Sequence, residues 1–169
     1  LNNELAFCLA SEKIMDIAIP ERAEYIRVIL CELNRIASHM LFYGVYGLDA
    51  GAMTPMLYAF RERERVQEFF ESVTGARLMH NYIRIGGVKE DLPSDFLGRL
   101  KNLLDDLKKG IDECDQLLSQ NEVFLARTKG VGILSGADAV DFGVTGPTLR
   151  ASGVAEDVRV TDTYSIYDR

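Results

Sequence analysis

The carboxylate of Asp49 lies in a long stretch of the sequence that carries no other charged side chain. Between Arg35 and Arg61 there are 25 residues, and Asp49 is the only acidic or strongly basic residue among them. An ionised carboxylate in apolar surroundings is costly unless a cation pairs with it or it keeps a proton. Such a group beside a cleft can donate a proton or anchor a ligand. The alternative, which side-chain chemistry alone favours, is that Asp49 caps the helix beginning near Thr54 or faces water in a glycine-rich turn.

The composition limits the classes of protein to which the chain can belong. Its 169 residues make one domain or part of a larger one, and 47% of them are hydrophobic, as in an ordinary globular protein. The net charge of −7 argues against binding to nucleic acid, which requires a basic face. Residues 36–60 are numerous enough to cross a bilayer, but they include His39, Asp49 and Pro55, so we predict that they do not span one.

The three cysteines predict no metal site. Cys8, Cys31 and Cys114 are too far apart in the sequence for a CxxC pair, and three thiols cannot all pair within one chain. We expect them to be small buried residues of a reduced, cytoplasmic protein. Both ends of the chain, which have no start methionine and no charged tail, suggest an excerpt from a longer polypeptide.

Most of the chain is predicted to be helical, in four segments that form an antiparallel bundle. Their expected ranges are 4–15, 20–41, 54–73 and 93–118. The second has the clearest pattern, because apolar residues recur at every third and fourth position: Ala23, Ile26, Ile29, Leu30, Leu33, Ile36, Ala37, Met40 and Leu41. We expect Thr54 to cap the third helix and Gly75 to end it, and Gly110 to interrupt the fourth at some cost.

From about residue 121 the pattern changes to closely spaced glycines, and only 136–143 suggest a short helix. The segment is too apolar for a disordered tail, and a long loop of this kind is usually a functional or interface element. The fold is therefore predicted to be mainly α. Residues 1–120 would form the bundle core, and 121–169 a glycine-rich irregular wrap of the same domain.

Two further polar clusters have simple structural explanations. The run 61–65 (RERER) places opposite charges three residues apart on a helix, which predicts a solvated face with pairs such as Arg61–Glu64. His80 lies between Arg77 and Arg84, and this trio can cradle an anion or a redox centre, although surface hydrogen bonding is the default. No motif for nucleotide binding or for a hydrolytic triad occurs, so we expect neither in this chain.

Eight strings of the sequence, in the same order, resemble the hydrogenase-like D subunit of respiratory complex I, the NADH:quinone oxidoreductase. They are 20–29 (PERAEYIRVI), 34–39 (NRIASH), 48–55 (LDAGAMTP), 58–64 (YAFRERE), 74–77 (TGAR), 81–88 (NYIRIGGV), 127–132 (RTKGVG) and 149–153 (LRASG). The resemblance covers essentially every residue from Asn2 to Arg169. It implies an internal fragment of such a subunit, with both ends truncated relative to the family and the fold of the nickel–iron hydrogenase large subunit.

The resemblance also implies partners and cofactors that the residues alone do not. The family's D subunit packs against a small subunit that holds the terminal iron–sulfur cluster, and the two enclose the quinone headgroup. NAD and the iron–sulfur clusters are bound by other subunits, and we expect this chain to bind no cofactor or metal by itself. The resemblance further implies that this subunit lies peripherally on the cytoplasmic side of the bacterial cell membrane, attached through partner subunits. We expect the isolated fragment to have no activity.

By the same resemblance, Asp49 matches the aspartate that pairs with a quinone-contacting histidine outside this chain, and it would hold that histidine protonated. Met53 and Thr54 would line the cavity, with packing and capping as the alternative. Arg77 and Arg84 would stabilise negative charge near the cluster, with salt bridges as the alternative. The family often has histidine where this chain has Met79, and His80 need not replace it.

Two other functions remain open from the sequence. The same architecture can take electrons from ferredoxin or a reduced deazaflavin instead of NADH. The chain can also be a non-catalytic helical interaction module. The electron donor and the binding of a small iron–sulfur subunit distinguish these possibilities.

Overall fold

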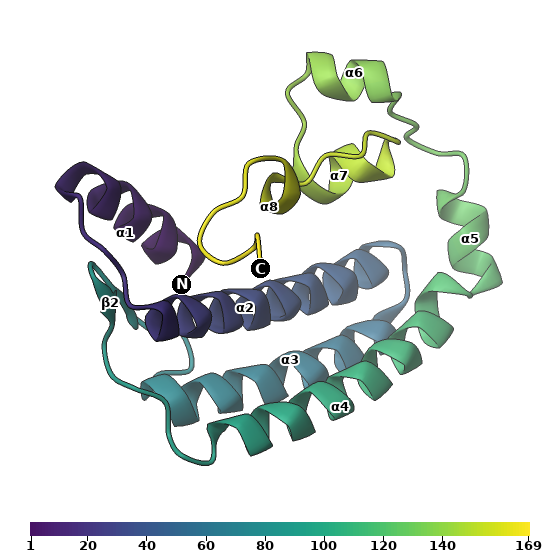
Figure 1. The fold of residues 1–169 in the computed structure, drawn as a ribbon. Coiled ribbons are helices and arrows are strands. Elements are labelled where there is room, and N and C mark those ends of the chain that lie inside the picture. The colour runs from purple at the N-terminus through teal and green to yellow at the C-terminus, as the bar shows by residue number, and fades with distance from the viewer. The chain divides into compact units, whose positions relative to one another are not determined.

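The computed structural model describes residues 1–169 and is mainly helical, as the sequence predicts (Figure 1). The chain divides into two compact units, Leu1–Phe124 and Leu125–Arg169. The elements are α1 (Asn2–Met15), α2 (Glu21–Asp49), α3 (Met53–Thr74), β1 (Ile83–Arg84), β2 (Gly87–Val88), α4 (Phe96–Cys114), the π-helical turn η1 (Asp115–Ser119), α5 (Glu122–Thr128), α6 (Gly136–Asp141), α7 (Gly146–Ala151) and α8 (Val158–Thr161). No helix combines the length and the apolar composition that a membrane span requires.

The first unit is built on α2 and α3, which lie side by side and run in opposite directions (Figure 1). Only residues 50–52 connect them. Their backbones approach closely at Gly44, where an added Cβ would lie 3.2 Å from both the Ala59 Cβ and the Met56 Cα. Helix α4 packs along α3, so the three longest helices share one core.

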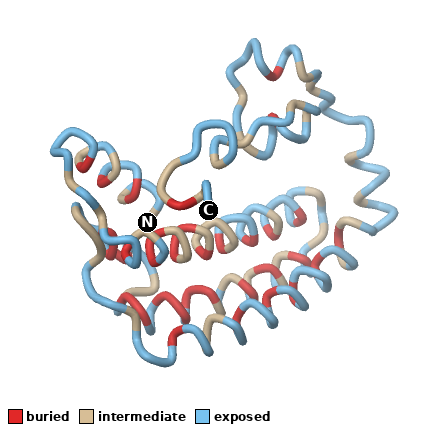
Figure 2. Tube along the Cα trace, in the orientation of Figure 1, coloured by how far each residue is buried: buried red, intermediate tan, exposed pale blue.

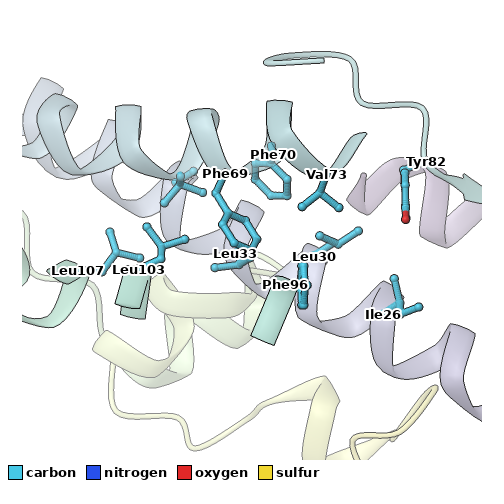
Figure 3. Close-up of a cluster of buried hydrophobic side chains, with 12 residues drawn as sticks. Ile26, Leu30, Leu33, Phe69, Phe70, Val73, Tyr82, Phe96, Leu103 and Leu107 are labelled. Atoms are coloured by element: carbon cyan, nitrogen blue, oxygen red, sulfur yellow. The ribbon is translucent and has the colours of Figure 1, made fainter. Parts of the chain in front are cut away.

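The core of this unit lies on the facing sides of α2, α3 and α4, and Tyr82 joins it from the segment just before β1 (Figure 2). Figure 3 shows most of its side chains, which are Ile26, Leu30, Leu33, Ala37, Val66, Phe69, Phe70, Val73, Tyr82, Phe96, Leu103 and Leu107. The stripe predicted on α2 is largely confirmed, because most of its members are buried. Leu41 is exposed, as are Leu104 and Ile111 on α4, because the buried face of each helix is narrower than its apolar stripe.

The helix ends follow local signals with one correction. Gly75 closes α3 in the left-handed conformation, with φ of 78°, as predicted. Helix α2 continues beyond Leu41 to Asp49. The prediction that Thr54 caps α3 was wrong, because α3 begins at Met53 and its N-cap is Ala52, which has no polar side chain to bond the free N–H groups.

The charged run on α3 is not a uniformly solvated face, so that prediction was wrong for Glu62. The Glu62 side chain is 0% exposed and accepts hydrogen bonds from Arg61 at 2.7 Å and from Arg65 at 2.9 Å. Arg61 also bonds Glu113 of α4 at 2.6 Å. Glu62 is buried because α4 presents Gly110 opposite it, and a Cβ at that position would lie 2.2 Å from the Glu62 Cδ. Gly110 thus makes room for a paired, buried carboxylate.

We expect Gly110→Ala to destabilise the protein by about 1–3 kcal/mol, because the new methyl group forces Glu62 out of its place between the arginines. Gly98→Ala is the matched control, since Gly98 lies on the same helix and an added Cβ there would contact nothing within 4 Å. This control should stabilise the helix by up to about 1 kcal/mol. Urea unfolding of both variants measures the difference. Equal effects at the two glycines would contradict the proposed role of Gly110.

A buried ion pair fastens the short β-hairpin to α1 and α2. Arg27 and Glu12 are 1% and 4% exposed, and their side chains meet in two hydrogen bonds of 2.6 and 3.1 Å. Arg27 also donates to the carbonyls of Gly87 at 2.9 Å and Arg84 at 2.6 Å, and Glu12 accepts from the Gly86 N–H at 2.7 Å. The pair thus satisfies three backbone groups of the hairpin as well as its own charges.

The Glu12 carboxyl predicts a loss of stability in acid. Burial acts to raise its pKa, but the hydrogen bonds from Arg27 and from the Gly86 N–H outweigh burial and hold the pKa below its ordinary value of 4.5. Because the folded pKa is the lower one, the contribution of Glu12 is complete above pH 4.5 and is lost as the pH falls through the folded pKa. We expect Glu12→Gln to weaken the dependence of unfolding free energy on pH between roughly pH 5 and pH 3. An unchanged slope would contradict this.

The second unit contains more helix than the sequence predicts. Helix α6 confirms the short helix expected in 136–143. Helices α5, α7 and α8 lie where irregular backbone was expected. Of these, α5 begins in the first unit. Each spans only four to seven residues, which is too short to show an apolar period. Local caps support two of them, since Asn121 accepts from the N–H groups at the start of α5 and Asp157 accepts from the Arg159 N–H in α8.

Candidate functional site

Asp49 is the last residue of the 29-residue helix α2 and is exposed. The turn after it is closed by backbone hydrogen bonds, from the Gly51 N–H to the Leu48 carbonyl at 2.9 Å and from the Ala52 N–H to the Gly47 carbonyl at 2.8 Å. Gly51 adopts a φ of 90°, which only glycine reaches at low cost. The turn is therefore well defined, and its acidic side chain points away from the core.

The Asp49 carboxylate has no hydrogen bond or ion pair within the chain. It lies at the C-terminal end of a long helix, where the helix dipole is negative, and the last turn of α2 has no basic residue. A carboxylate in this position is stabilised by a cation that comes close to it. No basic side chain of the chain forms an ion pair with Asp49, so the electrostatics favour a positively charged group from elsewhere.

Met53 and Thr54 are the first two residues of α3, and both are exposed beside the Asp49 turn. Large apolar side chains in the last turns of α2 and the first turns of α3 are exposed as well, namely Phe42, Val45, Tyr46, Leu48 and Leu57. Phe42 and Tyr46 stack with their ring centroids 5.6 Å apart. Asp49 is therefore followed and preceded in the chain by exposed apolar side chains, and exposed apolar surface often marks a binding site or an interface.

Arg77 lies just after α3 and is already bound to two carboxylates of that helix. Its guanidinium hydrogen-bonds Glu64, and it donates to Glu71 at 3.1 Å. The bond to Glu64 and then that to Glu71 raise the pKa of Arg77 above its ordinary value. Within this chain Arg77 forms salt bridges, which the sequence had left open as the alternative to a role near the cluster.

Arg84 lies on β1 with an exposed side chain that donates to the Asn81 side chain. Its carbonyl is the one that accepts from Arg27. The direction of the Arg84 side chain is thus set by a hairpin that the buried ion pair fastens in place.

Met79 and His80 face opposite ways. Met79 is 90% exposed and adopts a φ of 53°, an uncommon conformation for a residue with a long side chain. His80 is 7% exposed, packs on the Phe70 ring at 4.3 Å and donates from Nδ1 to the Ala76 carbonyl at 2.9 Å. Burial lowers the pKa of His80, which leaves its imidazole neutral near pH 7. Of these two residues, only Met79 presents its side chain to the surface, and the buried His80 does not take its place there.

The two groups of candidate residues lie at opposite ends of α3. Asp49, Met53 and Thr54 are at its start, whereas Arg77 follows its end. A helix of 22 residues is about 33 Å long. One small redox centre or ligand cannot contact both groups, so they must serve different neighbours if both are functional.

No group of three or more histidine, cysteine, aspartate or glutamate side chains in the chain is arranged to hold a metal ion. Sequence reasoning missed three structural features near the candidate residues. The Glu12–Arg27 pair joins different helices, the burial of Glu62 depends on Gly110 of another helix, and α4 continues into the π-helical turn η1. None of these leaves a local signal in the sequence, because each depends on which helices face one another.

Comparison with known proteins decides the family. Residues 49–169, which begin at the isolated acid, match the family described as "Respiratory-chain NADH dehydrogenase, 49 Kd subunit". The chain belongs to this family. The resemblance found in the sequence is thereby confirmed, and it extends to individual members.

Three relatives of the 49 kDa subunit family match almost the whole chain. The chain is 54% identical to the NADH-quinone oxidoreductase D subunit of Dehalococcoides mccartyi over 170 residues, which cover 100% of the chain and 46% of that protein. It is 51% identical to the corresponding D subunit of Clostridium beijerinckii, with 99% and 45% covered. It is 53% identical to NADH-quinone oxidoreductase subunit 4 of Thermus thermophilus, with 98% and 41% covered. The chain thus spans less than half the length of the curated relatives it matches.

Proposed function

We propose that the protein to which this chain belongs is a subunit of a proton-pumping NADH:quinone oxidoreductase, and that the surface around Asp49 helps to form its quinone-reduction cavity. The observation that carries the proposal is the match to the 49 kDa subunit family together with relatives named as NADH-quinone oxidoreductase subunits. Asp49, Met53 and Thr54 stand in one of the strings that resemble that family.

The electrostatics of Asp49 support its role. An exposed, unpaired carboxylate at the negative end of a helix dipole favours a nearby cation. In the whole subunit that cation is the imidazolium of the histidine outside this chain that the family resemblance implies. The pair keeps the histidine protonated, so that it hydrogen-bonds a quinone carbonyl and supplies a proton on reduction. The exposed apolar side chains of Met53 and Leu57 suit a wall of a cavity for an apolar quinone.

The remaining parts of the proposal concern neighbours of this chain. A small partner subunit holds the terminal iron–sulfur cluster, and the segment that carries Arg77, Met79 and Arg84 faces it. NAD and the other clusters are held by further subunits. The subunit lies peripherally on the cytoplasmic side of the bacterial cell membrane and is attached through partner subunits.

We also propose that the whole subunit has the fold of a nickel–iron hydrogenase large subunit. In that arrangement the helical bundle of residues 1–120 and the glycine-rich wrap of residues 121–169 are parts of one domain, which chain outside this segment completes. Substrate reduction is a property of the complete complex, so the isolated chain is inactive.

The test is to purify the complex through an affinity tag on the whole subunit. We expect it to retain a small iron–sulfur subunit and to reduce quinone with NADH as the electron donor. If quinone is reduced with ferredoxin or a reduced deazaflavin but not with NADH, the proposed electron donor is wrong and the proposed architecture still holds. Absence of both the iron–sulfur subunit and quinone reduction would overturn the proposal in favour of a non-catalytic interaction module.

A further inference from the structure

Helix α4 does not end in a regular way but continues into η1, a π-helical turn of five residues. In this turn the Gln120 N–H donates to the Asp115 carbonyl, five residues earlier, at 3.2 Å. Turns of this type are rare, arise where a side chain disturbs the regular ladder of hydrogen bonds, and are frequent at functional sites. A specific cause for η1 is therefore expected.

The hydroxyl group of Tyr43 on α2 contacts this turn. It donates to the Cys114 carbonyl at 2.6 Å and lies 3.2 Å from the Ser119 Oγ, so it touches both ends of η1. Burial raises the pKa of the Tyr43 phenol above its ordinary value of 10.0, which keeps the hydroxyl a neutral donor at physiological pH. Tyr43 thus ties the π-helical turn to α2.

Leu118, which belongs to η1, packs against the C-terminal end of α2. Leu118 is buried, and a Cβ on Gly47 would lie 3.1 Å from the Leu118 Cδ2, 3.4 Å from the Pro55 Cβ and 3.6 Å from the Ala52 carbonyl oxygen. Gly47 is one helical turn beyond Tyr43 on the same face of α2. Leu118, Gly47 and Pro55 therefore enclose the base of the turn that carries Asp49.

We propose that Tyr43 is a positioning residue for Asp49. Its hydroxyl holds η1, η1 seats Leu118 against Gly47, and this contact fixes residues 48–52 and the direction of the Asp49 carboxylate. The inference rests on the proposed function, because quinone reduction is the process that depends on that direction. The Tyr43 hydroxyl group thereby sets the geometry of the acid without touching any ligand.

The experiment is a double-mutant cycle in the whole complex. We expect Tyr43→Phe to lower quinone reduction roughly fivefold, which corresponds to the loss of one hydrogen bond. The reduction of ferricyanide by NADH and the subunit content of the complex should stay unchanged. In an Asp49→Asn background, Tyr43→Phe should cause no further loss, because it acts only through that acid. Tyr25→Phe, which removes an exposed hydroxyl without a hydrogen bond from the same helix, should change nothing in either background.

A second variant covers the case in which Tyr43→Phe does not assemble. Leu118→Val shortens the side chain that meets Gly47 and should lower quinone reduction in the same Asp49-dependent way. Unchanged quinone reduction in either assembled variant, or losses that multiply with that of Asp49→Asn, would overturn the inference and leave the proposed function intact. Full quinone reduction in Asp49→Asn itself would overturn the inference and would also remove Asp49 from the proposed quinone cavity.

Discussion

Replacing Asp49 by asparagine is expected to lower quinone reduction on the order of 100-fold, the effect of removing a group that holds a proton donor in its charged form. Asparagine has the same shape but no charge, so it could not keep protonated the histidine that we propose pairs with Asp49. The change lies at the exposed end of α2, outside the core, and assembly should be preserved. Steady-state quinone reduction by the whole complex measures the loss, and the electron paramagnetic resonance signal of the terminal cluster reports that the cluster is present.

Asp16→Asn is the matched control for this experiment. Asp16 follows the last residue of α1, is exposed and, like Asp49, is an unpaired carboxylate at the C-terminal end of a helix. It adopts the left-handed conformation, which asparagine tolerates, so its replacement is mild. The control should keep full activity. Equal activity in Asp49→Asn and Asp16→Asn would remove Asp49 from the quinone site.

Replacing Arg27 by methionine should destabilise the protein by about 3–5 kcal/mol, the cost of leaving a buried charge without its partner. The Glu12 carboxylate would keep only the Gly86 N–H as a donor, and the carbonyls of Arg84 and Gly87 would lose theirs. Urea unfolding of the chain, followed by circular dichroism, measures the change in free energy. Adding Glu12→Met to Arg27→Met should recover part of the loss, because the unpaired charge is then removed as well.

The control for Arg27 is Arg22→Met, near the start of the same helix. Arg22 bonds Asp91 at 2.9 Å, but the two side chains are 68% and 65% exposed, so water replaces the lost interaction and the unfolding midpoint should not move. The contrast tests the argument that burial, and not the presence of an ion pair, decides the effect. A similar loss in both variants would contradict the argument.

The sequence predicted much of the helical architecture because its signals there are local. The period of the apolar residues located α2 and α4, and Gly75 located the end of α3, since each depends on residues a few positions apart. The short helices α7 and α8 were missed because helices of four to six residues have no period to detect. The cap of α3 was misplaced because Thr54 offers a capping side chain that the structure does not use.

The candidate site was predictable only in part. That Asp49 has no charged neighbour along the chain can be read from the sequence. The family can be read from it as well, because eight segments resemble the family in the same order. The sequence also marked Arg77 and Arg84, and the helix predicted over 54–73 already places Arg77 a helix length away from Asp49. It did not indicate that Glu64 and Glu71 both bond Arg77, because that depends on how the chain turns back after α3.

What the sequence determined by itself was the helical class, the stripes that form the core and the family. The tertiary structure decided which charges are buried. Glu62 is enclosed because Gly110 of α4 faces it, Glu12 finds Arg27 across two helices, and Tyr43 reaches the carbonyl of Cys114. The physical reason is that a helical period needs only neighbours in the chain, whereas the state of a polar group depends on what packs against it from elsewhere.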